Sequence, residues 1–420
     1  MGNGRDHIIH KSKGAWLVFI VGVVLALVSF GRPESTSHGN KSVESNNSNN
    51  NNTSITEKNE KTETTEEASE SNIPEYLYDE NLKGLTPDNP ATNRVEYKET
   101  LLYLILNGVE SPVYLYFKGL NDDDIRLTSE YSDHTYYRLS GRELYDEDAN
   151  GVFKAKLAFE YKQGYYAYMN IMKGIAIPEG EEKAAKVAEV VKEFMDTYID
   201  DSMSDYKKEK AIYKYLAENV AYGDENAPSE SDQHTPYGAL VDHVAVCDGY
   251  SKAFDLMARC CGLEVDYVRG RSSEAKPDEP GHAWNMIKLN GEWYHVDVTW
   301  GDTCVKDFEY KDFSYGYFNL NDEQAKQALH VWDPDSYHVA TGEDFNFYKI
   351  NERLYNYNEF CEFVRDHRVS GNLLECSVTD YDSRYDINSI ISGYGYNGSW
   401  HWCVTNMNSN GYCTIYIYFD

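Results

Sequence analysis

The chain has 420 residues, which at roughly 150 residues per domain allows two or three domains. Its 70 acidic residues outnumber its 39 basic residues, so the net charge is −31 and binding to the phosphate backbone of nucleic acids is not expected. Hydrophobic residues make up 41% of the chain and 37 residues are tyrosines, so the chain as a whole is not disordered.

The first predicted element is an uncharged, mostly apolar segment of 18 residues (14–31) that follows Arg5, Lys11 and Lys13. A segment of this length lies at the lower limit for one membrane-spanning helix, and its basic flank predicts that the rest of the chain lies outside the cytoplasm. The small residues near Gly31 are also compatible with cleavage of a signal peptide. We therefore expect residues 1–32 to be a membrane anchor, or a signal segment that is cleaved before secretion.

Residues 33–72 form a low-complexity segment that consists mainly of Asn, Thr, Glu, Lys and Ser. Such a segment has too few apolar side chains to offset the entropy that ordering would cost. It is therefore predicted to be a disordered linker between the N-terminal segment and the folded part.

The pattern of residues 73–177 is mostly that of strands, because apolar side chains alternate in 113–117 and 153–161. We therefore predict a β-rich accessory domain over residues 73–180. Two helices are predicted next, over 181–199 and over 204–220, and Ser204 is a suitable cap for the second of them.

A third helix is predicted to begin at Cys247 and to end at Gly262. The unpaired N–H groups at a helix start stabilise a thiolate, which is the form of cysteine that attacks a carbonyl carbon. By position alone, Cys247 is more often a packed cysteine than a nucleophile, so the assignment depends on the partners that the fold brings to it.

Those partners are predicted by a β-hairpin whose turn is Asn290-Gly291, a strong signal for a two-residue loop. In that register Leu289 pairs with Glu292, and His282 and Asp297 lie diagonally on one face of the hairpin. The two side chains are then within reach of a hydrogen bond, whereas a slip of one residue would place them on opposite faces.

The chemistry that follows is that of a cysteine nucleophile. His282 would take the proton from Cys247 and later give one to the leaving group. Asp297 would orient the imidazole and stabilise its charged form. His295 shares the same face but lies on the same strand as Asp297, so His282 is preferred, and Asp302 is the reserve for the orienting acid.

Three short blocks of sequence resemble the transglutaminase-like superfamily: CDGYS (247–251), GHAWN (281–285) and WYHVDVTW (293–300). Residues 207–222, 237–240 and 317–320, together with His330, are similar to a bacterial extracytoplasmic branch of that superfamily. The resemblance covers about residues 204–338.

The resemblance implies an α+β fold with a papain-like or transglutaminase-like core. It implies a catalytic domain over 181–348, leaving 349–420 as a small C-terminal domain. It further implies a triad of Cys247, His282 and Asp297 that forms a thioester with a glutamine or peptide carbonyl of a protein or peptide substrate. The acyl group then passes to an amine or to water, as in transferases or in peptidases and amidases, and Tyr237 is a candidate to support the oxyanion. The alternative is an inactive binding or scaffold protein of the same fold at the cell surface.

No cofactor or metal is expected, because the sequence contains no CxxC pair, no HExxH helix and no glycine-rich phosphate loop. Without Cys247, seven cysteines remain, so at most three intrachain disulfides could form. Cys260 and Cys261 are expected to pack in the core, and the four cysteines after residue 351 could form a bridge in an oxidising compartment. The sequence does not indicate an oligomeric state.

Overall fold

The structure is a computed structural model that describes residues 73–120, 133–224, 228, 231–276, 279, 281–405 and 410–420. The predicted N-terminal anchor or signal (1–32) and the predicted linker (33–72) lie outside these residues. Within the described part of the chain, no helix is both long enough and apolar enough to cross a membrane.

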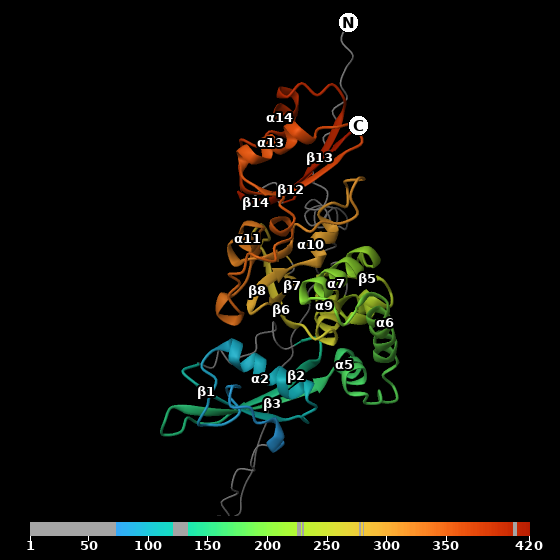
Figure 1. Cartoon of the computed structure of the whole chain (residues 1–420). Helices are drawn as coiled ribbons and strands as arrows, with labels where there is room; N and C mark the ends of the chain where they lie inside the picture. Colours follow the sequence, from blue (N-terminus) through green and yellow to red (C-terminus); the bar gives the residue numbers. More distant parts are fainter. Residues whose placement is uncertain are drawn as a thin grey trace, which may run out of the picture.

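The fold is α+β, and three main sheets follow one another along the molecule in chain order (Figure 1). The first sheet has the strand order β1-β3-β2 and is antiparallel. The elements of this first part are η1 (Glu75–Leu77), α2 (Arg94–Leu106), β1 (Val113–Lys118), β2 (Tyr137–Leu144), β3 (Val152–Tyr161) and α5 (Gln163–Lys173).

Helices α2 and α5 correct the prediction that residues 73–177 are mostly strand. Helix α2 is capped by Asn93, whose side chain accepts a hydrogen bond from the Glu96 N–H. Its buried residues recur at helical spacing, at Tyr97, Leu101 and Leu104. Helix α5 is rich in tyrosine, a residue that is typical of strands, so its composition gave no helical signal.

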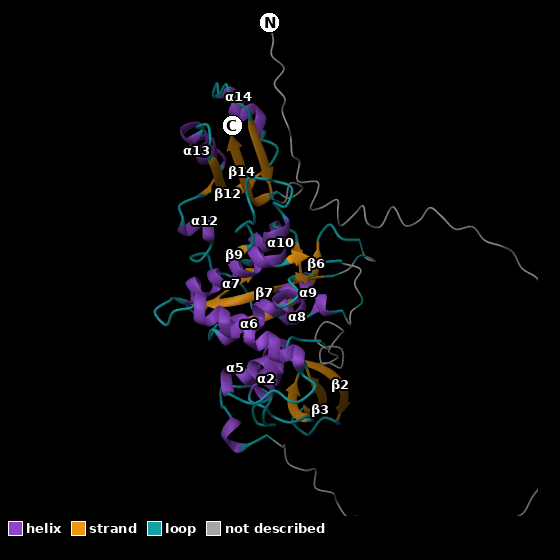
Figure 2. Cartoon of the chain, turned by 90° about the vertical axis from the view of Figure 1, so that its right-hand side faces the viewer, coloured by secondary structure: helices purple, strands orange, loops and turns teal. Residues whose placement is uncertain are grey.

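The central sheet has five strands in the order β10-β6-β7-β8-β9, and each neighbouring pair is antiparallel. Helices α6, α7, α8 and α9 gather beside it (Figure 2). The helices of this part are α6 (Glu182–Tyr198), α7 (Asp205–Asn219), η2 (Asp232–His234), α8 (Pro236–Leu240), α9 (Cys247–Cys260), α10 (Val298–Thr303), α11 (Asp322–Gln327) and η3 (Pro334–Ser336). The strands are β4 (Ala221–Tyr222), β5 (Val244–Ala245), β6 (Glu264–Ser272), β7 (His282–Leu289), β8 (Glu292–Val296), β9 (Phe318–Leu320) and β10 (His330–Val331).

The predicted hairpin is confirmed as β7 and β8. Leu289 pairs with Glu292, as the two-residue turn requires, and the register continues without a shift to the pair Asn285–Val296. Asn290 and Gly291 both have positive φ angles, 51° and 87°, which is the backbone of a type I′ turn. The predicted helices are also confirmed as α6, α7 and α9. Ser204 is the N-cap residue of α7, although its side chain accepts no capping hydrogen bond.

The C-terminal sheet has the order β11-β12-β14-β13 and a hydrophobic cluster of its own. Its elements are α12 (Phe347–Ile350), β11 (Leu354–Tyr355), α13 (Tyr357–His367), β12 (Leu373–Tyr381), α14 (Ile387–Gly393), β13 (Trp400–Val404) and β14 (Gly411–Phe419). All eight cysteines of the chain are free thiols, so the C-terminal bridge that an oxidising compartment would allow is not formed here.

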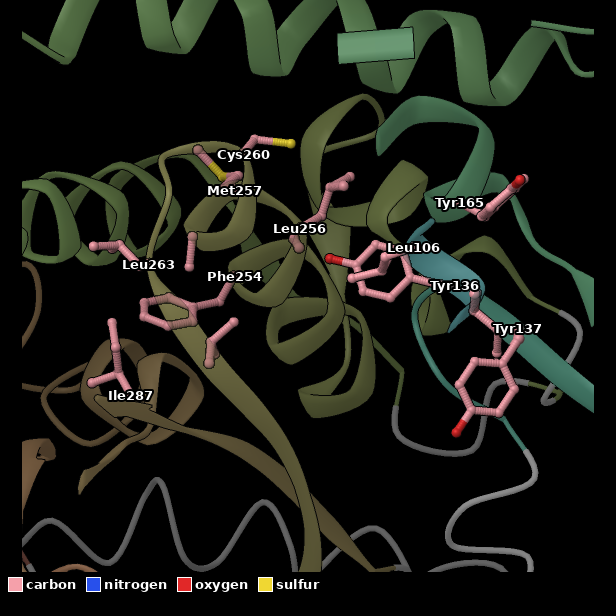
Figure 3. Packing of buried hydrophobic residues seen from close by; sticks show 14 of the residues in the cluster. Leu106, Tyr136, Tyr137, Tyr165, Phe254, Leu256, Met257, Cys260, Leu263 and Ile287 are labelled. Carbon is pink, nitrogen blue, oxygen red and sulfur yellow. The ribbon is translucent and has the colours of Figure 1, made fainter. Parts of the chain in front are cut away.

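One hydrophobic cluster joins the first sheet to the helix that begins at Cys247. Tyr136 and Leu106 lie beside Leu256 of α9 (Figure 3). The Tyr136 hydroxyl also donates a hydrogen bond to the carbonyl of Asp255, at 3.4 Å. The first sheet and the helix that carries the candidate nucleophile therefore share one core.

This shared core predicts that Tyr136→Ala lowers the free energy of unfolding by about 3 kcal/mol, the usual cost of truncating a buried aromatic side chain. We expect one cooperative transition in urea, with the fluorescence of the central sheet and the far-UV signal changing together. Tyr145→Ala is the control, because Tyr145 is 40% exposed, and it should change stability by less than about 0.5 kcal/mol. Separate transitions for the two parts would contradict a shared core.

Candidate active site

Cys247 is the first residue of α9, and its side chain is partly buried. The preceding residue, Val246, donates its N–H to the carbonyl oxygen of Gln233, at 3.0 Å. A Cβ atom at Gly249 would lie 2.3 Å from that same carbonyl oxygen, so only glycine allows η2 to approach the helix start so closely. The Cys-Asp-Gly sequence therefore fixes Cys247 at a helix N-terminus, where a thiolate is favoured.

His282 and Asp297 form the hydrogen bond that the hairpin register predicts. The distance between Nε2 of His282 and Oδ2 of Asp297 is 2.6 Å, and the two residues are 7% and 2% exposed. An ionised carboxylate can only accept hydrogen bonds, so Nε2 of His282 carries the proton and Nδ1 is left for the sulfur. The other carboxylate oxygen, Oδ1, caps α10 by accepting the N–H of Trp300 at 3.0 Å.

The electrostatics of the group favour charged forms. Burial would by itself lower the pKa of His282, but the Asp297 carboxylate and a hydrogen bond with Cys247 outweigh it and raise that pKa to about 10. Burial would raise the pKa of Asp297, but His282 and His330 hold it well below its ordinary value. At neutral pH His282 is therefore an imidazolium that lies between the Asp297 carboxylate and the Cys247 side chain.

Aromatic rings fix the orientation of the imidazole. The ring of Trp300 stacks on that of His282 with a centroid distance of 4.4 Å and an interplanar angle of 10°. Trp284 lies two residues after His282 on β7, and the centroids of these two rings are 5.7 Å apart. These contacts restrict rotation of the His282 ring between Asp297 and Cys247.

His330 also contacts Asp297, and sequence reasoning did not assign it this place. Its Nε2 lies 3.0 Å from the same Oδ2 atom of Asp297 that His282 contacts. The residue is 1% exposed and belongs to β10, which pairs with β6. The sequence marked His330 only as part of the family resemblance, because nothing local shows that an edge strand 33 residues after Asp297 returns to it.

The ligand-type atoms of His282, Asp297 and His330 lie within 4.8 Å of one another, close enough to consider a cation. The two histidines are hydrogen-bonded to Asp297 Oδ2 at 2.6 and 3.0 Å. A zinc ion binds its ligand atoms at about 2.0 Å and would have to displace the protons of these hydrogen bonds. We therefore treat the group as a hydrogen-bonded cluster, and the absence of a metal stays a prediction from the sequence.

The other three residues that the sequence singled out, His295, Asp302 and Tyr237, have other partners. His295 accepts a hydrogen bond from the Trp284 indole at 3.0 Å and contacts Asp322 at 2.9 Å. Asp302 accepts the hydroxyl of Tyr250 at 2.7 Å, so it is not the orienting acid.

Tyr237 lies on α8, and its ring faces the ammonium group of Lys183 on α6, at 5.3 Å from the ring centroid. In the part of the chain that the structure describes, no hydrogen bond joins Tyr237 to Cys247. Support of the oxyanion by Tyr237 therefore stays a prediction.

A buried ionic network begins at Asp248, the residue after the candidate nucleophile. Lys252, whose side chain is 1% exposed, contacts Asp248 at 3.1 Å and Asp133 of the first part at 2.9 Å. Asp248 also accepts the Tyr267 hydroxyl, and Arg269 lies 3.7 Å away. Ion pairs therefore connect the first turn of α9 to the first part of the chain.

The geometry defines an α+β protein with a cysteine at a helix start and a buried histidine–aspartate pair beside it. Residues 192–298 match the sequence model of the transglutaminase-like superfamily, so this part of the chain is a transglutaminase-like domain. It contains all three residues of the predicted triad.

Two curated proteins are similar to the same region. Kyphoscoliosis peptidase of Mus musculus and that of Homo sapiens are each 30% identical over 122 residues, which are 27% of this chain and 18% of each relative. The chain thus matches less than a fifth of the length of these relatives.

Among solved structures, one described as a TGase covers 45% of this chain and 51% of its own, with 17% identity and a TM-score of 0.23. The periplasmic domain of TgpA from Pseudomonas aeruginosa covers 47% and 71%, with 12% identity and a TM-score of 0.22. At TM-scores this low, we conclude nothing about this chain from these two structures.

The ionic network predicts that Lys252→Met lowers the free energy of unfolding by about 3 kcal/mol, because it removes the buried cation that Asp248 and Asp133 share. The measurement is urea unfolding of the variant beside Lys207→Met, which replaces an exposed lysine of α7. The control should change stability by less than about 0.5 kcal/mol. Equal stability of the two variants would show that the network contributes nothing.

Proposed function

We propose that this chain is an enzyme that forms a thioester between Cys247 and a glutamine or peptide carbonyl of a protein or peptide. The acyl group then passes to an amine or to water. The observation that carries the proposal is the 2.6 Å hydrogen bond between His282 and Asp297 beside a cysteine at a helix start. The basic and apolar pattern of residues 5–31 supports a place outside the cytoplasm, at the cell membrane or secreted.

The first half of the reaction is acylation. The Cys247 thiolate attacks the carbonyl carbon, a C–S bond forms, and the π electron pair moves to the oxygen. The N–H groups at the start of α9 stabilise that oxyanion in the proposed reaction. When the C–N bond breaks, the leaving nitrogen takes the proton from Nδ1 of His282, and ammonia or an amine departs.

The second half returns the enzyme to its starting state. Nδ1 of neutral His282 takes a proton from the incoming amine or water, whose nitrogen or oxygen attacks the thioester. The C–S bond breaks with its electron pair on sulfur, so the thiolate and the imidazolium are restored. Asp297 stays ionised throughout and keeps the His282 proton that it binds on Nε2.

The thiolate–imidazolium pair predicts that Cys247 reacts with iodoacetamide at about pH 6 at least tenfold faster than an ordinary thiol. The labelling rate should stay high at acidic pH because the raised pKa of His282 keeps its imidazole protonated, and this positive charge keeps the thiolate ionised as the pH falls. Cys361 is an internal control, because it and Cys247 are the two partly buried cysteines of the chain. Mass spectrometry of the labelled peptides measures both rates.

The same experiment tests the inactive alternative. If Cys247 is labelled no faster than Cys361 at any pH, the chain is a scaffold of the same fold and the proposed chemistry is wrong. His282→Gln should remove the fast labelling, because it removes the cation that holds the thiolate.

Turnover distinguishes the two enzyme classes. A dansylated amine and a glutamine-containing protein are incubated with the full chain, and both amine incorporation and released ammonia are measured. Incorporation indicates a transferase, whereas ammonia or new amino termini without incorporation indicate a hydrolase.

Cys247→Ala and His282→Ala should each lower this turnover about 10³-fold or more, and Asp297→Asn should leave a measurable fraction. Full turnover by Cys247→Ala would exclude the mechanism.

A further inference from the structure

The Asp297 carboxylate accepts three hydrogen bonds, and two of them end on the same oxygen. Oδ1 accepts the N–H of Trp300, while Oδ2 is 2.6 Å from His282 Nε2 and 3.0 Å from His330 Nε2. Since the carboxylate can only accept, His330 must carry its proton on Nε2. With the proton on Nε2, the second ring nitrogen, Nδ1, carries a lone pair, so its 3.3 Å approach to the carbonyl oxygen of Ala325 is a contact between two acceptors and not a hydrogen bond.

The His330 ring is held as tightly as the His282 ring. Trp300 lies against it with a centroid distance of 4.2 Å, and Trp284 meets it edge-on at 4.7 Å. Burial lowers the pKa of His330 to about 4, so the residue is a neutral donor over the pH range in which the enzyme would work. It therefore contributes an N–H group and no charge of its own.

We propose that His330 is a positioning residue of the cysteine site, which donates to Oδ2 of Asp297 and thereby limits how strongly Asp297 stabilises the imidazolium form of His282. Two donors on one oxygen compete, because each one draws on the same negative charge. The His330 bond is therefore strongest when His282 is neutral, and it favours that state. This inference rests on the proposed function, which requires His282 to release its proton to the leaving group.

Asp302 of α10 is the titratable neighbour whose charge changes near neutral pH, because burial raises its pKa to about 6. Burial raises the pKa of Tyr213, Cys304 and Tyr317, and lowers that of His295. The remaining neighbour is Cys247, the partner on the other nitrogen of His282. A change in the titration of His282 on substitution of His330 is therefore transmitted through Asp297.

A matched pair of variants tests the role. His330→Asn keeps a polar group near Nδ1 and Ala325 but cannot reach Asp297, whereas His330→Gln can place an N–H near the position of Nε2. His295→Gln controls for the loss of another buried imidazole of the central sheet. The full chain is used, and the rate of Cys247 alkylation by iodoacetamide is followed from neutral to alkaline pH, where its last step reports deprotonation of His282.

For His330→Asn we expect this alkaline midpoint to rise by about one pH unit, since a hydrogen bond to a carboxylate is worth roughly one unit of pKa. Turnover should fall about tenfold with KM unchanged, as for other residues that orient a catalytic group. His330→Gln should restore both quantities, and His295→Gln should leave the midpoint in place.

An unshifted midpoint in folded His330→Asn, or a Gln variant that behaves like the Asn variant, would overturn this inference alone. A wild-type chain whose Cys247 reacts as an ordinary thiol would overturn the proposed function and this inference with it. The two failures are distinguishable because the second is visible before any His330 variant is made.

Discussion

The hydrogen bond between His282 and Asp297 is the interaction on which the rest of the site depends. It exists because the two-residue turn at Asn290-Gly291 sets the register of β7 and β8, and a slip of one residue would separate the two side chains. Asp297 also caps α10, so one carboxylate connects the hairpin, the helix that follows it and the His282 imidazole. A change in any of them would move the imidazole relative to the sulfur.

Burial of that carboxylate has a consequence for the surrounding residues. An ionised group that is 2% exposed must be hydrogen-bonded to be tolerated, and Asp297 has donors on both oxygens. A second ionic group lies beside the candidate nucleophile, where Lys252 joins Asp248 to Asp133. In a chain with a net charge of −31, the buried cation Lys252 thus lies in the helix that begins at the candidate nucleophile.

The sequence predicted the parts of the site that depend on local rules. A helix start, a glycine at the helix end and an Asn-Gly turn each have a short-range signature, and together they placed Cys247, His282 and Asp297. It did not predict His330 or Asp133, because their contacts join residues 33 and 119 positions apart in the chain. Helix α5 was missed because its tyrosines are typical of strands.

The central claim is that Cys247 and His282 form a thiolate–imidazolium pair. Thiolate absorbance in the ultraviolet, recorded during a pH titration, tests it without any substrate. The account predicts one ionised thiol per chain at about pH 6, which is lost in both Cys247→Ser and His282→Gln. A titration with no thiolate until about pH 8, as for a free cysteine, would contradict it.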